Sequence, residues 1–285
     1  MRTPISPQSV SKISVNMFVM EPLSYTWTDE DAEHELRMVH VPGTEGVPFM
    51  FGSGDSKVSV ECSDFYIAST PVTQSLWTHV MGSNPSCRIE AAAPVENVSW
   101  EDIAGGGGFL DRINASSILS ALAGTSSKRF RLPSETEWEY AARGGPNWTD
   151  GFTFSGSNDP DEVAWYGLKW SGGALKWRFH KTFIGRLLFG TTAVTRPEPQ
   201  THPVARKAPN RLGIYDMCGN VWEWCEDVCT EEPPKDGTPY LGPGYERRLR
   251  GGCFNNWDFL CSVSWRYGIA QDSHDGCIGF RLALS

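Results

Sequence analysis

The alternation of apolar and polar residues is regular in the first half of the chain and weak in the second. The stretch 37–52, RMVHVPGTEGVPFMFG, alternates around a Pro-Gly pair and further glycines, which predicts a β-hairpin. The stretch 64–82 predicts a strand and then a helix, with Thr73 as the N-cap and Gly82 as the end. The apolar face of this helix comprises Leu76, Trp77, Val80 and Met81.

Two further helical patterns follow. In RLPSETEWEYAARGG, Ser134 and Glu137 form a capping box and Gly144 ends the helix. The inward face of that helix comprises Trp138, Ala141 and Ala142. The pattern at 99–114 is interrupted by Gly105 to Gly108, which together cost about 3–4 kcal/mol against alanine in a helix interior. It predicts a broken or closely packed helix.

Beyond Gly145 the sequence is rich in Gly, Pro, Asn and Trp, and helical patterns nearly vanish. Residues 146–210 are predicted to be long and irregular, with 172–190 as an insertion that adds a small helix or hairpin. In residues 250–285, RGG predicts a tight turn and IGFRLALS a closing strand. The residues between them mix aromatic, acidic and small polar types without any period.

Composition excludes several classes of protein. The chain has 285 residues, 40% of them hydrophobic and 12% aromatic, which is ample for the core of a soluble globular protein. Its formal charge of -9 disfavours nucleic acid as a partner. No run approaches the ~18 apolar residues that a spanning helix needs, so membrane insertion is not expected.

The cysteines and the first residues bear on location. Eight cysteines are too sparse for a disulfide scaffold, and Cys225 and Cys229 are expected to be buried free thiols. The first twenty residues show neither a signal peptide nor a lipid-anchor cysteine. The location is therefore left open between the cytoplasm and the cell surface or export.

Motifs along most of the chain resemble the formylglycine-generating enzyme (sulfatase-modifying factor) family. In order, they are MVHVPG, FYIASTPVTQSLWTHVMGSNPS, PVENVSWEDI, RFRLPSETEWEYAARGG, DEVAWYG, THPVARKAPNRLGIYDMCGNVWEWCED and RLRGGCFNN…CIGFRLA. The resemblance implies an α+β, C-type-lectin-like domain with few regular elements and long loops. This domain is predicted at 38–285, with 1–37 as an N-terminal arm or edge extension.

The family includes enzymes whose metal sites this sequence lacks in part. The copper-dependent oxidase needs two thiolates five residues apart, because linear copper(I) coordination takes two soft ligands. By resemblance the second position is Cys261 and the first is Asn256, while Cys253 lies eight residues from Cys261. The iron sulfoxide synthases need a histidine cluster that this sequence does not contain. An enzyme is therefore not expected.

One stretch resembles the calcium-binding loops of the family. NRLGIYDMCGNVWEW offers hard oxygen ligands, and calcium is the one cofactor considered. The candidate ligands are Asn210, Asp216, Asn220 and Glu223. The alternative is that these side chains only hydrogen-bond the backbone of turns.

A non-catalytic branch of the family provides a further resemblance. It comprises the variable proteins of diversity-generating retroelements, which rewrite adenines so that AAC codons become any NNC codon. Family members commonly have an Asn-rich sequence between the GG and IGFR motifs. Here the matching positions hold residues that NNC codons encode, and Lys, Glu and Met are absent from 253–277. Trp257, Trp265 and Gln271 need another codon origin.

The resemblance thus predicts a variable region at about 250–285. The aromatic, Asp, Ser, His and Asn content of this region suits a binding surface, as in antibody paratopes. The predicted ligand-binding residues are Asn255, Asn256, Trp257, Asp258, Phe259, Leu260, Ser262, Ser264, Tyr267, Ile269, Gln271, Ser273, His274 and Asp275. Phe254 and Trp265 are expected to be buried, and Arg266 and Arg281 to anchor backbone and carboxylates.

The leading prediction is a monomeric, non-catalytic protein that displays this variable surface to an unknown protein or surface ligand. Two other functions stay open. One is a divergent copper oxidase that uses Cys261 with Cys253, and the other is an accessory domain with a fixed partner. A plain surface loop with inward aromatics would also account for 254–277.

Overall fold

The computed structural model describes residues 20–29, 32–122, 127–169, 194–195 and 200–285. The predicted insertion at 172–190 lies outside these residues. The helices are α1 (Gln74–Met81), α2 (Trp100–Ala104), α3 (Phe109–Ala115), α4 (Ser117–Ala121), α5 (Glu135–Ala142) and α6 (Pro160–Val163), with short 3-10 turns η1 (Gly54–Ser56), η2 (Gly145–Asp150) and η3 (Asp258–Cys261).

The strands are β1 (Leu23–Thr28), β2 (Glu33–Val41), β3 (Phe49–Phe51), β4 (Val58–Val60), β5 (Phe65–Ala68), β6 (Phe130–Arg131), β7 (Leu168–Lys169), β8 (Val194–Thr195), β9 (Trp222–Val228), β10 (Glu246–Arg250), β11 (Arg266–Ala270), β12 (Ile278–Phe280) and β13 (Ala283–Leu284). Most of them are short. The residues between them are held by side-chain hydrogen bonds as well as by ladders.

The larger sheet has five strands in the order β1-β2-β5-β13-β6. The C-terminal strand β13 lies inside this sheet, antiparallel to both β5 and β6. The boundary predicted between residues 37 and 38 falls within β2, and β1 forms the edge of the same sheet. Residues 23–29 and 32–37 therefore pack as part of the domain.

The hairpin predicted over 37–52 is wrong. Residues Met38–Val41 pair with β5, whereas Phe49–Phe51 pairs with β4. The chain does turn at 44–47, where Val47 N donates to Thr44 O, but β2 and β3 do not pair across this turn. Thr44 N donates to Cys62 O and Gly43 N donates to Asp64 Oδ1, so long-range bonds hold the turn against the 62–64 segment.

The predicted helix ends are confirmed for α1 and α5. The Thr73 side chain caps α1, and Gly82 ends it in the left-handed region. Ser134 and Glu137 form the full capping box of α5. The interruption at 105–108 is also confirmed, since α2 ends at Ala104 and α3 starts at Phe109.

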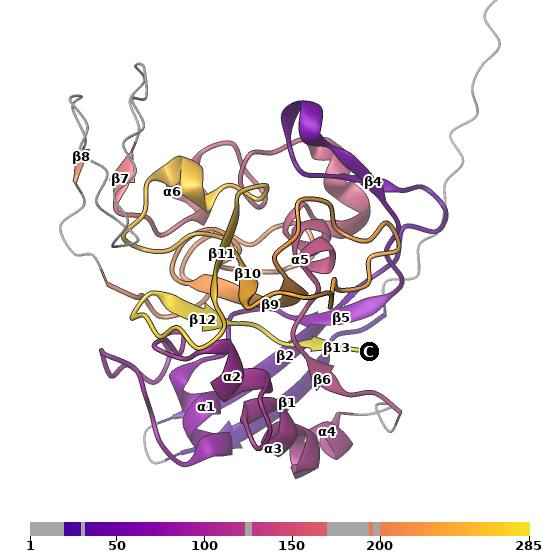
Figure 1. Ribbon diagram of the computed structural model, residues 1–285. Coiled ribbons are helices and arrows are strands. Elements are labelled where there is room, and N and C mark those ends of the chain that lie inside the picture. Colours follow the sequence, from indigo (N-terminus) through magenta and orange to yellow (C-terminus); the bar gives the residue numbers. More distant parts are fainter. Residues whose placement is uncertain (1–19, 30–31, 123–126, 170–193, 196–199) are drawn as a thin grey trace, which may run out of the picture.

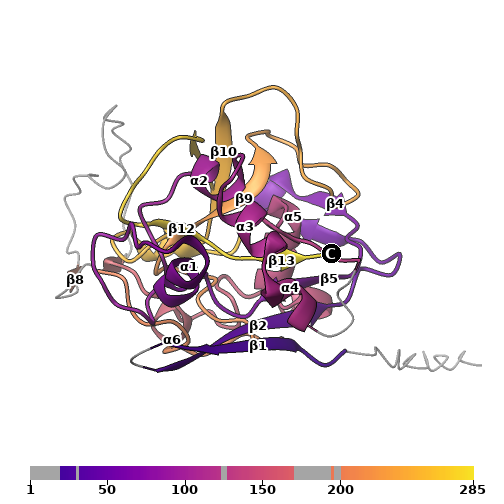
Figure 2. The same cartoon turned by 90° about the horizontal axis from the view of Figure 1, so that it is seen from below.

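The smaller sheet has four strands in the order β11-β10-β9-β12 and carries the predicted variable region. Figure 2 shows β1 and β2 along one side of the molecule and β9 and β10 on the opposite side. One core lies among helices α1 to α4 and strands of both sheets, and it includes Trp77, Phe109, Trp224 and Phe280. A second core forms around α5, β3 and β4. Figure 1 shows α5 and β4 on the same side of the molecule. No helix among the described residues is long and apolar enough to cross a membrane.

Candidate binding surface

The predicted variable region starts at a sharp turn after β10. Gly251 and Gly252 both have positive φ, and a Cβ on Gly252 would lie 2.7 Å from Cys261 Sγ. The chain then forms η3, passes along β11 as the edge strand, and returns through 271–277 to β12. Strand β11 pairs with β10 and β12 pairs with β9, so β9 and β10 support the whole region.

Two arginines of this region, together with Arg248 just before it on β10, contact the buried carboxylate of Glu135 on α5. Arg266 donates to both oxygens at 2.7 and 2.6 Å, Arg250 donates at 3.3 Å, and Arg248 Nε lies 3.4 Å away. Burial alone would raise the pKa of Glu135, but these guanidinium groups hold that pKa below its ordinary value. The carboxylate is therefore charged, and it acts as a fixed anchor.

Two more ion pairs are buried, Arg250 with Glu139 and Arg281 with Glu223. Together with the pairs of Glu135 and the buried residues around them, they form what we call the frame. Arg250 Nη2 donates to Glu139 Oε2 at 2.5 Å and to Val263 O at 2.7 Å, which ties α5 to the chain beyond η3. Arg281 donates to both oxygens of Glu223 at 2.6 Å and also to Ala68 O. The prediction that Arg266 and Arg281 anchor carboxylates and backbone is confirmed.

The four calcium candidates have other partners in this structure. Both Glu223 oxygens accept from Arg281, and Oε2 also accepts from Trp138 Nε1. Asn220 pairs with the backbone of His202, and Asn210 Oδ1 accepts from two backbone amides in its own turn. Asp216 Oδ1 is the one carboxylate oxygen of the set without a hydrogen-bond partner. Calcium takes six to eight oxygens, and the side chains of Glu223, Asn220 and Asn210 are already engaged in hydrogen bonds within the protein.

Four of the fourteen predicted ligand-binding residues are buried: Asn256, Trp257, Asp258 and Ser262. Asn256 O accepts from Gly167 N and Leu168 N, while its side-chain Oδ1 accepts from Cys253 N. It therefore fastens the loop to the 165–169 segment and does not face solvent. The sequence shows no period here that would have identified these inward positions.

The other ten are half-buried or exposed. They are Asn255, Phe259, Leu260, Ser264, Tyr267, Ile269, Gln271, Ser273, His274 and Asp275. Tyr267 and Ile269 pack partly against the first core, with the Tyr267 ring 5.6 Å from Trp222. Phe254 and Trp265, which were expected to be buried, pack against the same core but stay half-buried.

The loop 271–275 docks on the N-terminus of α2. Trp100 N donates to Gln271 O, Gln271 Nε2 donates to Glu101 Oε1, and His274 Nε2 lies 2.7 Å from Asp102 Oδ2. Arg247 stacks over Trp100, 3.8 Å from its ring centroid. The sequence patterns did not mark Trp100, Glu101 or Asp102 as neighbours of the C-terminal region, because 170 residues separate Glu101 from Gln271.

The thiols near η3 bear on the oxidase alternative. Cys261 is buried, and burial, with a smaller contribution from Cys253, raises the pKa of its thiol well above the ordinary value. Cys253 Sγ lies 3.3 Å from Asn256 Oδ1, so Asn256 accepts a hydrogen bond at the position that the family resemblance assigns to the first thiolate. All eight cysteines are free; Cys225 is buried and Cys229 is half-buried. Within the described residues, no group of three or more His, Cys, Asp or Glu is arranged to hold a metal ion.

Fold and site together define an α+β, C-type-lectin-like scaffold whose ion-paired frame supports a partly exposed C-terminal loop. The chain belongs to the family of the sulfatase-modifying factor enzyme 1-like domain, whose model matches residues 26–285. The first prediction of family and fold class is thereby confirmed.

Named relatives and one solved structure agree with this assignment. The chain is 37% identical over 200 residues to chaperone protein LppX of Paenibacillus barcinonensis, which covers 61% of this chain and 65% of the relative. It is 33% identical over 216 residues to the formylglycine-generating enzyme of Streptomyces coelicolor, which covers 73% and 57%. The chain thus spans less than two thirds of each relative.

The solved structure is that of Treponema denticola variable protein 1. It matches with a TM-score of 0.62 and 30% identity, over 92% of this chain and 99% of that one. The relatives also include an inactive Cα-formylglycine-generating enzyme 2 of Mus musculus, at 28% identity. Membership of the family is therefore compatible with both catalytic and non-catalytic proteins.

Proposed function

We propose that this chain is a non-catalytic ligand-binding protein that displays a sequence-variable surface near its C-terminus, as the variable protein of a diversity-generating retroelement. The observation that carries the proposal is the division between frame and loop. Buried ion pairs from Glu135, Glu139 and Glu223 fix the frame. The loop they support has partly exposed side chains of adaptable types. The similarity to Treponema denticola variable protein 1 over nearly both full lengths supports the same function.

The binding surface of this proposal is smaller than the sequence suggested. It consists of the ten half-buried or exposed residues between Asn255 and Asp275, while Asn256, Trp257, Asp258 and Ser262 belong to the frame. A buried position gives a ligand no contact, and a change there disturbs packing. Exposed positions can change with little effect on stability. The expected ligand is a protein or another molecule on a surface. The net charge of -9 disfavours nucleic acid.

The alternative function is a divergent copper oxidase, which the contact between Cys261 and Cys253 favours. Cys261 Sγ lies 3.9 Å from Cys253 O, so the two residues are neighbours in the fold. Against it, copper(I) binding would need two thiolates, and burial favours the neutral thiol of Cys261.

A copper titration separates the two functions. The full chain is titrated with copper(I) against a chelator and then incubated with oxygen and a cysteine-containing peptide, with Cys261→Ser as the matched variant. The display proposal expects no one-to-one binding, no oxidised peptide, and only a change of stability in the variant. Tight stoichiometric binding with oxygen-dependent oxidation that Cys261→Ser abolishes would instead establish the oxidase.

A further inference from the structure

A second surface lies away from the variable region, at the free edge of β4. Within the part of the chain that the structure describes, strand β4 pairs with β3 on one side only, with Val58 opposite Phe51 and Val60 opposite Phe49. Figure 1 shows β4 and β12 on different sides of the molecule. The edge of β4 is therefore separate from the surface proposed above.

The backbone at this edge has a defined direction. Successive residues of a strand point their N–H and C=O groups to opposite sides. Glu61 N donates to Lys235 O at 2.8 Å and therefore points away from β3. The main-chain N–H and C=O groups of the other odd-numbered residues of this strand point the same way. Both main-chain groups of Ser59 consequently face outward, and outside the β3–β4 ladder no described residue makes a backbone hydrogen bond with them.

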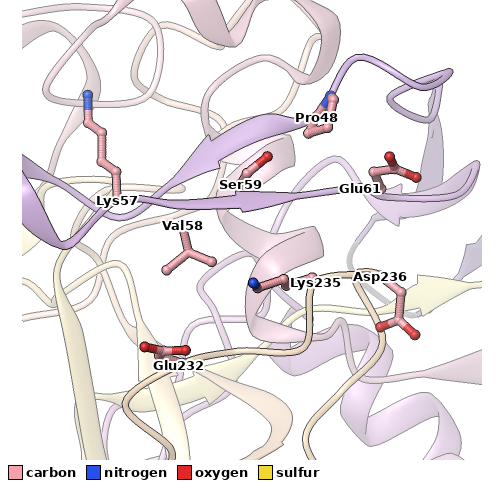
Figure 3. A pocket seen from close by; sticks show the side chains of 8 residues that line it. All are labelled: Pro48, Lys57, Val58, Ser59, Glu61, Glu232, Lys235 and Asp236. Carbon is pink, nitrogen blue, oxygen red and sulfur yellow. The ribbon is translucent and has the colours of Figure 1, made fainter.

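A cavity lies between the free edge of β4 and the 232–236 loop. Its volume is about 620 Å³, within the range of ligand pockets, and it is lined by Pro48, Lys57, Val58, Ser59, Glu61, Glu232, Lys235 and Asp236. Figure 3 shows Val58 pointing from β4 toward the loop that carries Glu232 and Lys235. The bond from Glu61 to Lys235 closes one end, so the 232–236 loop makes one rung of a ladder and then leaves β4.

The charge of the lining indicates the kind of occupant. Three carboxylates and two ammonium groups line the cavity, and the whole chain carries a formal charge of -9. Both favour a cationic partner. Val58 and Pro48 add apolar surface for one side chain of the occupant.

From this geometry we propose that the edge of β4 binds an extended, basic segment of a partner protein by β-strand addition. The segment continues the rung that Lys235 begins. It accepts a hydrogen bond from Ser59 N–H and donates one to Ser59 C=O, and its lysine or arginine side chains contact Glu61, Glu232 and Asp236. In strand addition of this kind, main-chain bonds provide affinity and side-chain contacts provide specificity.

Panning of a random 12-residue peptide library on the full chain tests the proposal. We expect selected peptides to be enriched in Lys and Arg over Asp and Glu, and to bind Ser59→Ala as they bind the original chain. Ser59→Pro removes the outward N–H without touching the ladder to β3, and should weaken binding about tenfold. Thermal unfolding of both variants checks that they fold.

Two further measurements keep the outcome decisive. N-methylation of a selected peptide at alternate amides, with its side chains unchanged, should abolish binding in one register only. Glu232→Gln should weaken binding and Lys235→Gln should not. The proposal is overturned if no peptide is selected, if acidic peptides are selected, or if Ser59→Pro and N-methylation both leave affinity unchanged.

Discussion

At the scale of single residues, Glu135 is the carboxylate of the frame that contacts three arginines. Its carboxylate is fully buried and is shared by Arg250, Arg266 and Arg248. The sequence predicted the roles of Arg266 and Arg281 through the family resemblance. It could not predict that Glu135 is their neighbour, because Glu135 falls in the first turn of a capped helix, where a carboxylate is favourable without any partner.

Replacement of Glu135 by Gln should destabilise the protein by about 3–5 kcal/mol, since Arg266 and Arg248 lose their carboxylate and Arg250 keeps only Glu139. Urea unfolding of the variant measures this loss. Glu90→Gln is the matched control, because Glu90 pairs with Arg88 on the surface at 3.7 Å, and should change stability by less than about 0.5 kcal/mol. Equal effects of the two changes would show that Glu135 is not the anchor.

Asp216 should make stability depend on pH. Burial raises the pKa of this carboxyl to about 6, although Ala205 N–H and Arg281 favour the ionised form. In the unfolded chain its pKa is about 4, so the folded state binds the proton more tightly. The stabilisation is complete below about pH 4 and is lost as pH rises through about 6, a loss of about 3 kcal/mol.

Asp216→Asn isolates this effect. The amide mimics the protonated carboxyl, keeps an acceptor for Ala205 N–H, and tolerates the positive φ of 55° at this position. The unfolding free energy of the variant minus that of the original chain should grow between pH 4 and 7. Parallel stability curves over that window would contradict the raised pKa.

At the scale of elements, local signals were reliable where a cap or a glycine decided the conformation. Thr73, Ser134 and Gly82 act as the sequence predicted. The hairpin failed because Met38–Val41 finds its partner in β5, a long-range contact that alternation cannot encode. In the variable region, inward and outward residues follow no period, so the burial of Asn256 and Trp257 could not be read from the pattern.

The glycines between α2 and α3 give a prediction at this scale. A Cβ on Gly108 would lie 2.6 Å from Asp102 O, whereas one on Gly106 would meet nothing within 4 Å. Gly108→Ala should therefore cost about 1–3 kcal/mol, and Gly106→Ala should be nearly neutral. Thermal unfolding of the two variants makes the comparison. A neutral Gly108→Ala would mean that α2 and α3 pack less closely than described.

At the scale of the whole molecule, we propose that the chain consists of a rigid frame and a C-terminal loop that the frame displays. If this division holds, simultaneous changes at the exposed or half-buried positions Gln271, Ser273 and His274 should shift stability by less than about 1 kcal/mol. Asn256→Ala alone should cost more, because Cys253 N would lose its acceptor in a buried site. Differential scanning calorimetry measures both. A larger loss from the triple change would place those residues in the frame.

The most direct test of the central claim is to sequence the DNA that flanks the gene and to search it for a near-copy of the segment encoding Arg250 to Ser285. We expect such a copy beside a reverse transcriptase gene, differing from the coding segment almost only where the copy has adenine. We also expect the differences to fall at the exposed or half-buried positions and to spare Asn256 and Arg266. A flanking region without any copy would contradict the proposal that this surface is diversified.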